Sequence, residues 1–324
     1  MQKNLLKRRC FSGDLLDECS DDVPPASRKK VAKPEKIELP EGAKTYEDIF
    51  AWPDDLVPRL LRLWRLRHIS TEPKKIQINL TTSYSGAGFA EAAALLVAKA
   101  FQRHTLFEVE VKLHSQTEIK KDLHQFLVAE HVFSDLMARA SEGVTASLET
   151  MQKDKIIQAK KIRKGDKDEL RRLGDEFFRE AMEYLSNVPP EAWHDTAYCV
   201  HHCGQCKWMP DRSGANNCLS LWVEIAGNTC TPWSARGSQW GWLDPNSLPS
   251  LIWVWSLKRA GGGPDLVVNE CTVLWPGERF FQSVFPDALV ESCKFSPTDL
   301  GSLSTLVDFC FRMVLSDACA FLRF

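Results

Sequence analysis

The chain of 324 residues lacks a long apolar run, a secretory leader and a strong net charge. No run of roughly 18 apolar residues occurs, so the sequence predicts no transmembrane helix. The segment Met1–Arg9 has no apolar h-region, which argues against secretion. The formal net charge of −2 excludes a protein that is basic overall, but it is compatible with a local basic groove. These absences predict a protein of the nucleus or the cytoplasm with no membrane partner. They do not indicate an oligomeric state.

The chain also lacks the short, cysteine-dense pattern of a secreted disulfide framework. Its 11 cysteines are scattered, so free thiols or metal ligands are expected. Cys203 and Cys206 form half of a possible zinc site, with Cys199 and Cys218 as candidate partners. The second pair lacks the usual tight spacing. The sequence therefore favours free cysteines and no metal, and a zinc-supported interaction module is the weaker alternative.

Composition divides the chain into five segments. The cluster Arg28–Lys30 is compatible with a nuclear localisation signal, although a solvated linker explains it more simply. The expected organisation is a disordered charged tail over 1–44, the first half of a globular domain over 45–138, a charged helical insertion over 139–195, the second half of the domain over 196–301, and an atypical C-terminal tail over 302–324.

Strand and helix patterns alternate in the first half of the domain. Residues 75–80 and 107–113 alternate like strands, and residues 89–100 between them form a strong helical pattern. A short apolar run follows at Val132 and Phe133. This order predicts an α/β fold with a mostly parallel sheet and helices on both faces.

Chemically distinctive residues follow the predicted strands of this first half. The segment Tyr84-Ser85-Gly86-Ala87-Gly88 is a small-residue turn between a strand and a helix, where glycine lets the backbone approach a ligand. Glu118 and Asp135 follow the second and third strand patterns. An acid after the second strand can bind ribose hydroxyls, and one after the third can hold an amino group of adenine. The ordered set predicts a nucleotide-type site.

A thiol and an acid follow strand patterns in the second half. Cys230 comes after the apolar run 219–226, in a turn rich in polar residues, and Glu270 comes after 265–268. The carboxyl ends of strands in an open α/β sheet are where ligands bind. A nucleophile beside an acid is therefore a candidate catalytic pair.

Together these segments resemble the cytosine-C5 methyltransferase family. Tyr84–Gly88 is similar to the family's Phe-x-Gly-x-Gly turn, and Phe133-Ser-Asp135-Leu136 is similar to its third motif. Asn228-Thr-Cys230-Thr-Pro-Trp-Ser234 is similar to the Pro-Pro-Cys-Gln-x-Phe-Ser loop. Asn269-Glu270-Cys271 stands where the family has Glu-Asn-Val.

The resemblance implies a Rossmann-like fold, S-adenosyl-L-methionine as cofactor and DNA as partner, with RNA as the alternative substrate. Tyr84–Gly88, Glu118 and Asp135 would then bind the cofactor. Cys230 would add to C6 of cytosine while Glu270 contacts N3. Ser234 and Arg236 are candidate substrate contacts, and Arg236 is also a candidate cation near the thiol. Trp233, Trp240 and Trp242 are candidates for stacking on an extruded base, with core packing as the equal alternative.

The sequence also departs from the family's pattern. Thr229 and Thr231 replace a proline and a glutamine beside the cysteine, and Phe89 replaces a common glycine. Segment 302–312 contains one arginine where the family has an arginine-bearing motif. These departures suggest a divergent, truncated chain whose last residues are foreign to the fold. The alternative function is an inactive relic that binds cofactor or nucleic acid without turnover.

Overall fold

The computed structural model describes residues 53–54, 57–58, 75–86, 89–105, 107–119, 129–162, 166–211, 219–261, 263–295 and 309–315. These residues all belong to one compact unit, Pro40–Phe324. The predicted tail 1–44 lies outside the described residues, as do Ala87, Gly88 and Cys218.

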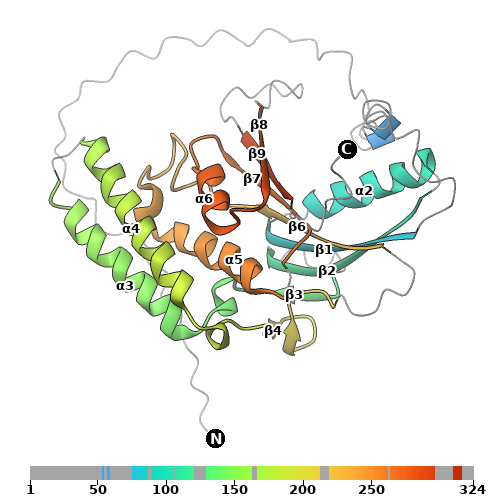
Figure 1. Ribbon diagram of the computed structural model, residues 1–324, viewed down its shortest axis with the longest axis horizontal. Coiled ribbons are helices and arrows are strands. Elements are labelled where there is room, and N and C mark those ends of the chain that lie inside the picture. Colours follow the sequence, from blue (N-terminus) through green and yellow to red (C-terminus); the bar gives the residue numbers. More distant parts are fainter. Residues whose placement is uncertain are drawn as a thin grey trace, which may run out of the picture. The chain divides into compact units, whose positions relative to one another are not determined.

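A sheet of nine strands organises this unit in the order β5-β4-β3-β2-β1-β6-β7-β9-β8 (Figure 1). The five strands β3-β2-β1-β6-β7 are parallel to one another. Their order is the 3-2-1-4-5 order of a doubly wound α/β fold, and it reverses between β1 and β6. The strands are β1 (Lys75–Gly86), β2 (Glu108–Ile119), β3 (His131–Phe133), β4 (Thr196–Cys199), β5 (Gly204–Lys207), β6 (Leu219–Gly227), β7 (Leu266–Thr272), β8 (Leu289–Phe295) and β9 (Phe309–Leu315).

The prediction of a mostly parallel sheet holds for the centre and is wrong for both edges. At one edge, the hairpin β4–β5 runs antiparallel and pairs with β3. At the other edge, β9 is antiparallel to both β7 and β8. A short turn can join only antiparallel strands, so the closely spaced segments β4 and β5 had to form a hairpin.

Strand β9 comes from the segment 302–324 that the sequence set apart as atypical. Its seven residues pair along their whole length with β7 and with β8. The run Phe-Cys-Phe-Arg-Met-Val-Leu is rich in residues that favour strands, and this was the overlooked signal. Residues 309–315 are therefore part of the sheet and not foreign to the fold.

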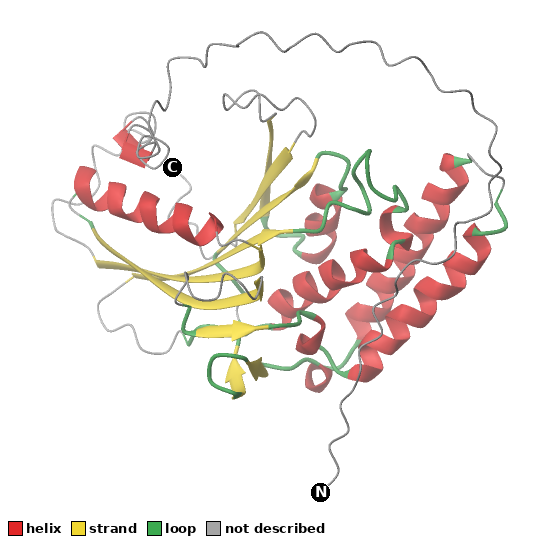
Figure 2. Cartoon of the chain, turned by 180° about the vertical axis from the view of Figure 1, so that it is seen from behind, coloured by secondary structure: helices red, strands yellow, loops and turns green. Residues whose placement is uncertain are grey.

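Helices lie on both faces of the sheet, as predicted. α2 (Phe89–His104) packs on β1 and β2, and it lies across the sheet from the main group of helices in Figure 2. On the opposite face lies α5 (Leu248–Arg259), whose Trp253 bonds to Glu224 of β6. The side chains of α5 are buried almost all round, and α6 (Gly277–Val284) and Met182 of the insertion pack against it.

The predicted insertion 139–195 contains α3 (Glu142–Ala159) and α4 (Lys167–Asn187). Asp166 caps α4 by accepting a hydrogen bond of 3.1 Å from the Glu169 amide. The apolar stripe of α4 enters the main core, where Phe178 stacks on Trp242 with 4.7 Å between ring centroids. The charged helical insertion expected from the sequence therefore packs onto the domain.

The two faces of the central strands differ in polarity. The face toward α2 is apolar and includes Ile78, Leu80 and Val223. The face toward α5 carries buried polar side chains, among them Thr81, Ser83 and Glu224. Within the described part of the chain, no helix combines the length and the hydropathy that a bilayer crossing requires.

Candidate active site at the carboxyl edge of the sheet

The structure brings the regions of Cys230 and Glu270 to the same edge of the sheet. Strands β6 and β7 are parallel neighbours, and Gly227 at the end of β6 pairs with Glu270. Cys230 follows Gly227 by one short loop and is exposed. A Cβ on Gly227 would lie 3.4 Å from Oε2 of Glu270, so this carboxyl group packs directly against the glycine backbone. Cys230 thus follows β6, and Glu270 lies near the carboxyl end of the neighbouring strand β7, at the expected edge.

Buried hydrogen bonds anchor the loop that leads to Cys230. The Asn228 amide donates to the Glu270 carbonyl at 3.0 Å, which ties the loop to β7. The side chain of Asn269 donates to Oδ1 of Asn228 at 3.1 Å, and that of Asn228 donates to Ser250 on α5 at 3.2 Å. The loop therefore starts from a fixed point between β7 and α5.

The residues after Cys230 form a tight turn around its carbonyl. The amides of Trp233 and Ser234 donate to the Cys230 carbonyl at 2.9 and 2.8 Å. The Ser238 amide returns to the Thr231 carbonyl at 3.0 Å. A Cβ on Gly237 would lie 1.9 Å from that carbonyl oxygen, so only glycine fits there. The turn presents the thiol on its exposed side.

Burial raises the pKa of Glu270 above its ordinary value. Desolvation disfavours the ionised carboxylate because folding removes water from around the side chain. Glu270 therefore retains its proton to a higher pH than a free glutamic acid. A carboxyl group in that state can donate a hydrogen bond as well as accept one.

The predicted cofactor residues lie at the ends of β1, β2 and β3. Tyr84 and Glu118 both have left-handed backbones, with φ of 56° and 60°. Such conformations are uncommon outside glycine and concentrate at functional sites. Burial, and to a lesser extent the charge of Asp135, raise the pKa of Glu118. Glu118 and Asp135 are thus close enough to interact, at neighbouring strand ends.

Three buried charged residues behind this edge were not singled out from the sequence. Arg139 is only 2% exposed and donates to Ser83 on β1 and Thr117 on β2, at 3.2 and 3.0 Å. Glu224 accepts from Ser83 at 2.6 Å and from the Trp253 indole at 2.8 Å.

The third residue is Glu91 of α2, which accepts from Thr82 at 2.5 Å and from Gln116 at 2.9 Å. Together the three groups cross-link β1, β2, β6 and α2. A carboxylate inside the apolar run of β6 and another in the first turn of an alanine-rich helix were the signals available in the sequence.

A cavity of about 770 Å³ lies between α2 and the apolar face of the sheet. Its lining is almost entirely aliphatic and reaches the carboxyl edge at Tyr84, Gly227 and Glu270. Glu118 and Asp135 are not among its described lining residues. The cavity therefore meets the candidate catalytic acid, but it is not the polar nucleotide-type site that the sequence predicted.

The other residues predicted to contact the substrate lie partly on the surface and partly in the core. Ser234 is half-buried within the turn, and Arg236 is exposed. Among the described residues, the structure records no contact between Arg236 and Cys230. Trp242 belongs to the core, where it packs edge-on against Trp233 with 5.0 Å between ring centroids. Trp233 and Trp240 are partly buried against the same core, so all three indoles contribute to packing.

The predicted zinc ligands are only partly brought together. Cys199 and Cys206 face each other across the hairpin β4–β5. Cys203 is exposed in the turn between them and points its thiol at the Val200 carbonyl, at 3.7 Å. Among the described residues, His131 and His202 complete the group and Cys203 does not join it, while Cys218 lies outside those residues. Sequence spacing could not reveal His131 as a ligand because it comes from a distant strand.

Comparison with known proteins adds little to this geometry. No family model matches the chain, and no curated protein is similar to it. A solved structure of the Entamoeba histolytica methyltransferase EhMeth is similar with a TM-score of 0.31 and 11% identity, over 74% of this chain and 53% of that one. The match spans about half of that methyltransferase. A likeness of this extent carries no argument about activity, so the function rests on the chemistry of the site.

Proposed function

We propose that this chain is an S-adenosyl-L-methionine-dependent methyltransferase that acts on C5 of cytosine in DNA. One observation carries the proposal. An exposed thiol follows β6, and a half-buried acid with a raised pKa lies near the carboxyl end of the neighbouring parallel strand β7, at the edge beside the point where the strand order reverses. The motif resemblance at Cys230 and Glu270 gives this pair its assignment.

The residues at the first three strand ends suit the cofactor. S-adenosyl-L-methionine, when bound, supplies the methyl group that C5 of cytosine receives. Glu118 and Asp135 offer carboxylate oxygens for hydroxyl and amino groups. Tyr84 has a left-handed backbone and lies two residues before the end of β1. These donor and acceptor types fit a nucleoside, and we assign them to the cofactor.

Cys230 and Glu270 would act on the cytosine ring in one sequence. The Cys230 thiolate forms a bond to C6, and the ring electrons move toward N3. The protonated Glu270 carboxyl stabilises N3 by donating a hydrogen bond or the proton itself. After C5 has been methylated, loss of the C5 proton to a base restores the double bond and releases the thiolate. The raised pKa of Glu270 serves this role because it keeps the proton available.

The test is covalent trapping on DNA that contains 5-fluorocytosine, in the presence of cofactor. Fluorine at C5 cannot leave as a proton, so the adduct with Cys230 persists and is seen on a denaturing gel. Wild-type protein and Cys203→Ser should both trap, because Cys203 is an exposed thiol outside the proposed site. Cys230→Ser should not trap.

Two other results would redirect the proposal. If the protein binds the cofactor but forms no adduct and transfers no methyl group to any nucleic acid, the proposed enzymatic activity is wrong. That result would favour the inactive relic. Adduct formation on a matched RNA but not on DNA would retain the Cys230 chemistry and assign an RNA substrate.

A further inference from the structure

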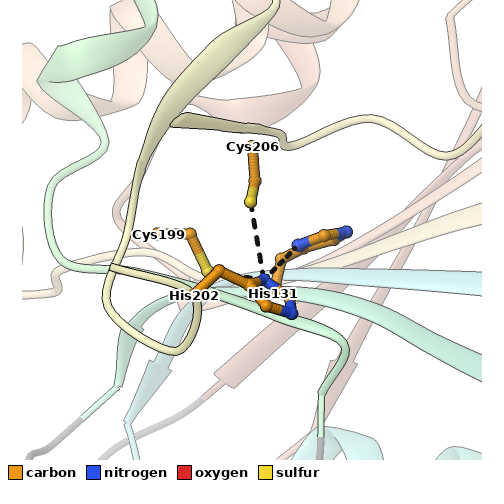
Figure 3. A group of neighbouring side chains, drawn as sticks. All are labelled: His131, Cys199, His202 and Cys206. Carbon is orange, nitrogen blue, oxygen red and sulfur yellow. Dashed lines mark hydrogen bonds between the residues drawn. The ribbon is translucent and has the colours of Figure 1, made fainter. Parts of the chain in front are cut away.

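Four metal-binding side chains meet at the edge of the sheet farthest from β8. They are Cys199 at the end of β4, Cys206 on β5, His202 in the turn between these strands, and His131 on β3 (Figure 3). One ligand atom from each residue lies within 4.8 Å of the other three. We propose that these residues bind a structural Zn²⁺ ion through two thiolates and two imidazoles.

Three of the six distances between ligand atoms in this cluster match those of a tetrahedral zinc site. With Zn–S of about 2.3 Å and Zn–N of about 2.0–2.1 Å, the S···N edges are about 3.5 Å and the N···N edge is about 3.3 Å. Nδ1 of His202 lies 3.5 Å from each of the two sulfurs and 3.2 Å from Nδ1 of His131. Three edges of the site therefore have the lengths that zinc requires.

The local chain makes this convergence possible. Cys199 and Gly204 pair across the hairpin, and Ala197 pairs with Cys206, so the two thiols come from facing strands. Cys203 adopts a left-handed backbone with φ of 51°, which closes the turn and leaves His202 beside both sulfurs. The spacing Cys-x-x-His-x-x-x-Cys keeps three ligands in one hairpin.

Groups around the cluster orient its ligands. His131 directs Nδ1 into the cluster, while its Nε2 lies 3.9 Å from a carboxylate oxygen of Glu130. A carboxylate on the outer nitrogen is the usual support of a zinc-bound histidine. The Val132 amide points at the Cys199 sulfur at 3.4 Å, which suits a thiolate. Both contacts are of the kind that supports a bound metal ion.

The ion would fasten the hairpin to the sheet. Strand β3 is three residues long, and within the described residues it pairs with β4 through the single bridge between Phe133 and Cys199. Strands this short contribute few hydrogen bonds. An ion with one ligand on β3 and three in the hairpin would therefore add a further connection between the two. The proposed role is structural because all four tetrahedral positions are taken by protein. The zinc site does not depend on the proposed methyltransferase activity.

The test is metal analysis of the purified full chain after reconstitution with Zn²⁺ and removal of free metal. About one equivalent per chain is expected for the wild type, and near zero for Cys199→Ser and Cys206→Ser. Cys203→Ser is the matched control, since it alters a thiol of the same turn and should retain the ion. Glu130→Gln should weaken Zn²⁺ binding by about 10–100-fold.

A spectroscopic measurement on the wild type covers the case in which a ligand variant fails to fold. Co²⁺ in a tetrahedral site with two thiolates absorbs strongly in the visible region, and Zn²⁺ should displace it. Wild-type protein that stays folded without bound metal and gives no such spectrum would overturn the proposal. Loss of the ion in Cys203→Ser would also overturn the ligand set, because that result would point to Cys203 with Cys206.

Discussion

The thiol of Cys230 and the thiols of Cys199 and Cys206 occupy opposite chemical settings in one sheet. Cys230 is exposed on a turn held by backbone hydrogen bonds, beyond the carboxyl end of a central strand. Cys199 and Cys206 meet two imidazoles on an edge hairpin. An accessible thiol at the same sheet edge as a half-buried acid suits reversible bond formation, whereas converging thiols and imidazoles suit a fixed ion. The neighbours, and not the residue type, decide what a cysteine can do.

The largest expected effect is the loss of the nucleophile. Cys230→Ser should abolish the adduct with 5-fluorocytosine DNA and lower methyl transfer by on the order of 10³-fold or more. A serine hydroxyl is far less nucleophilic toward an aromatic carbon. The variant should still bind one Zn²⁺, as measured by metal analysis. Loss of both properties at once would mean that the two regions are not independent.

The acid partner gives the second prediction. Glu270→Gln should lower methyl transfer by about 10²–10⁴-fold, since the amide cannot supply the proton that N3 needs.

The same variant should be more stable than the wild type at pH 8, and this advantage should shrink as the pH falls toward 4.5. Because burial raises the pKa of Glu270 in the folded state, the folded protein holds this proton more tightly than the unfolded chain. Stability from this group is therefore lost as pH rises through the folded pKa. Thermal unfolding of both proteins at pH 8 and pH 4.5 measures this stability difference. An equal difference in unfolding midpoint at the two pH values would contradict the prediction.

The turn that presents the thiol gives the third prediction. Gly237→Ala would place a Cβ 1.9 Å from the Thr231 carbonyl oxygen, so the turn must move. We expect a loss of about 1–3 kcal/mol in stability and about a tenfold slower adduct formation. Gly261→Ala is the control, since a Cβ there meets nothing within 4 Å. Equal adduct rates for the two variants would show that the position of the turn does not matter.

The smallest expected effect on trapping comes from the other thiol region. Cys206→Ser should lower the midpoint of thermal unfolding and remove its dependence on added Zn²⁺. Adduct formation should stay within about threefold of wild type, since Cys206 lies on the far edge hairpin, separated from β6 by four strands. The rate of adduct formation should be measured at temperatures below the unfolding transition of Cys206→Ser. A large loss of trapping there would show that the two thiol regions are not independent.

Local patterns predicted much of the fold. The alternation of strands and helices led to the central α/β order, and charged helical spacing led to the region of α3 and α4. The edges were not predictable in this way. The run Phe309–Leu315 reads as a strand, but nothing local indicates that it enters between β7 and β8. Strand insertion depends on which edge is open, and that is a property of the assembled sheet.

Chain order and strand direction were enough to predict part of the candidate site. Parallel strands bring their carboxyl ends to one edge, so the expectation that Cys230 and Glu270 lie near each other follows from chain order alone. The left-handed backbone of Glu118 and the buried Arg139 were not accessible from the sequence, because both arise from the way β1, β2 and β3 meet.

The amino-acid sequence by itself determined the parallel core and the placement of a thiol and an acid at or just past the carboxyl ends of two of its strands. These follow from short-range periodicity and from the fixed geometry of parallel strands. Only the tertiary structure decided which cysteines form a metal cluster, because His131 lies far from the hairpin in the chain and close to it in space. Folding also raised the pKa of Glu270, because it removes water from around the carboxyl group.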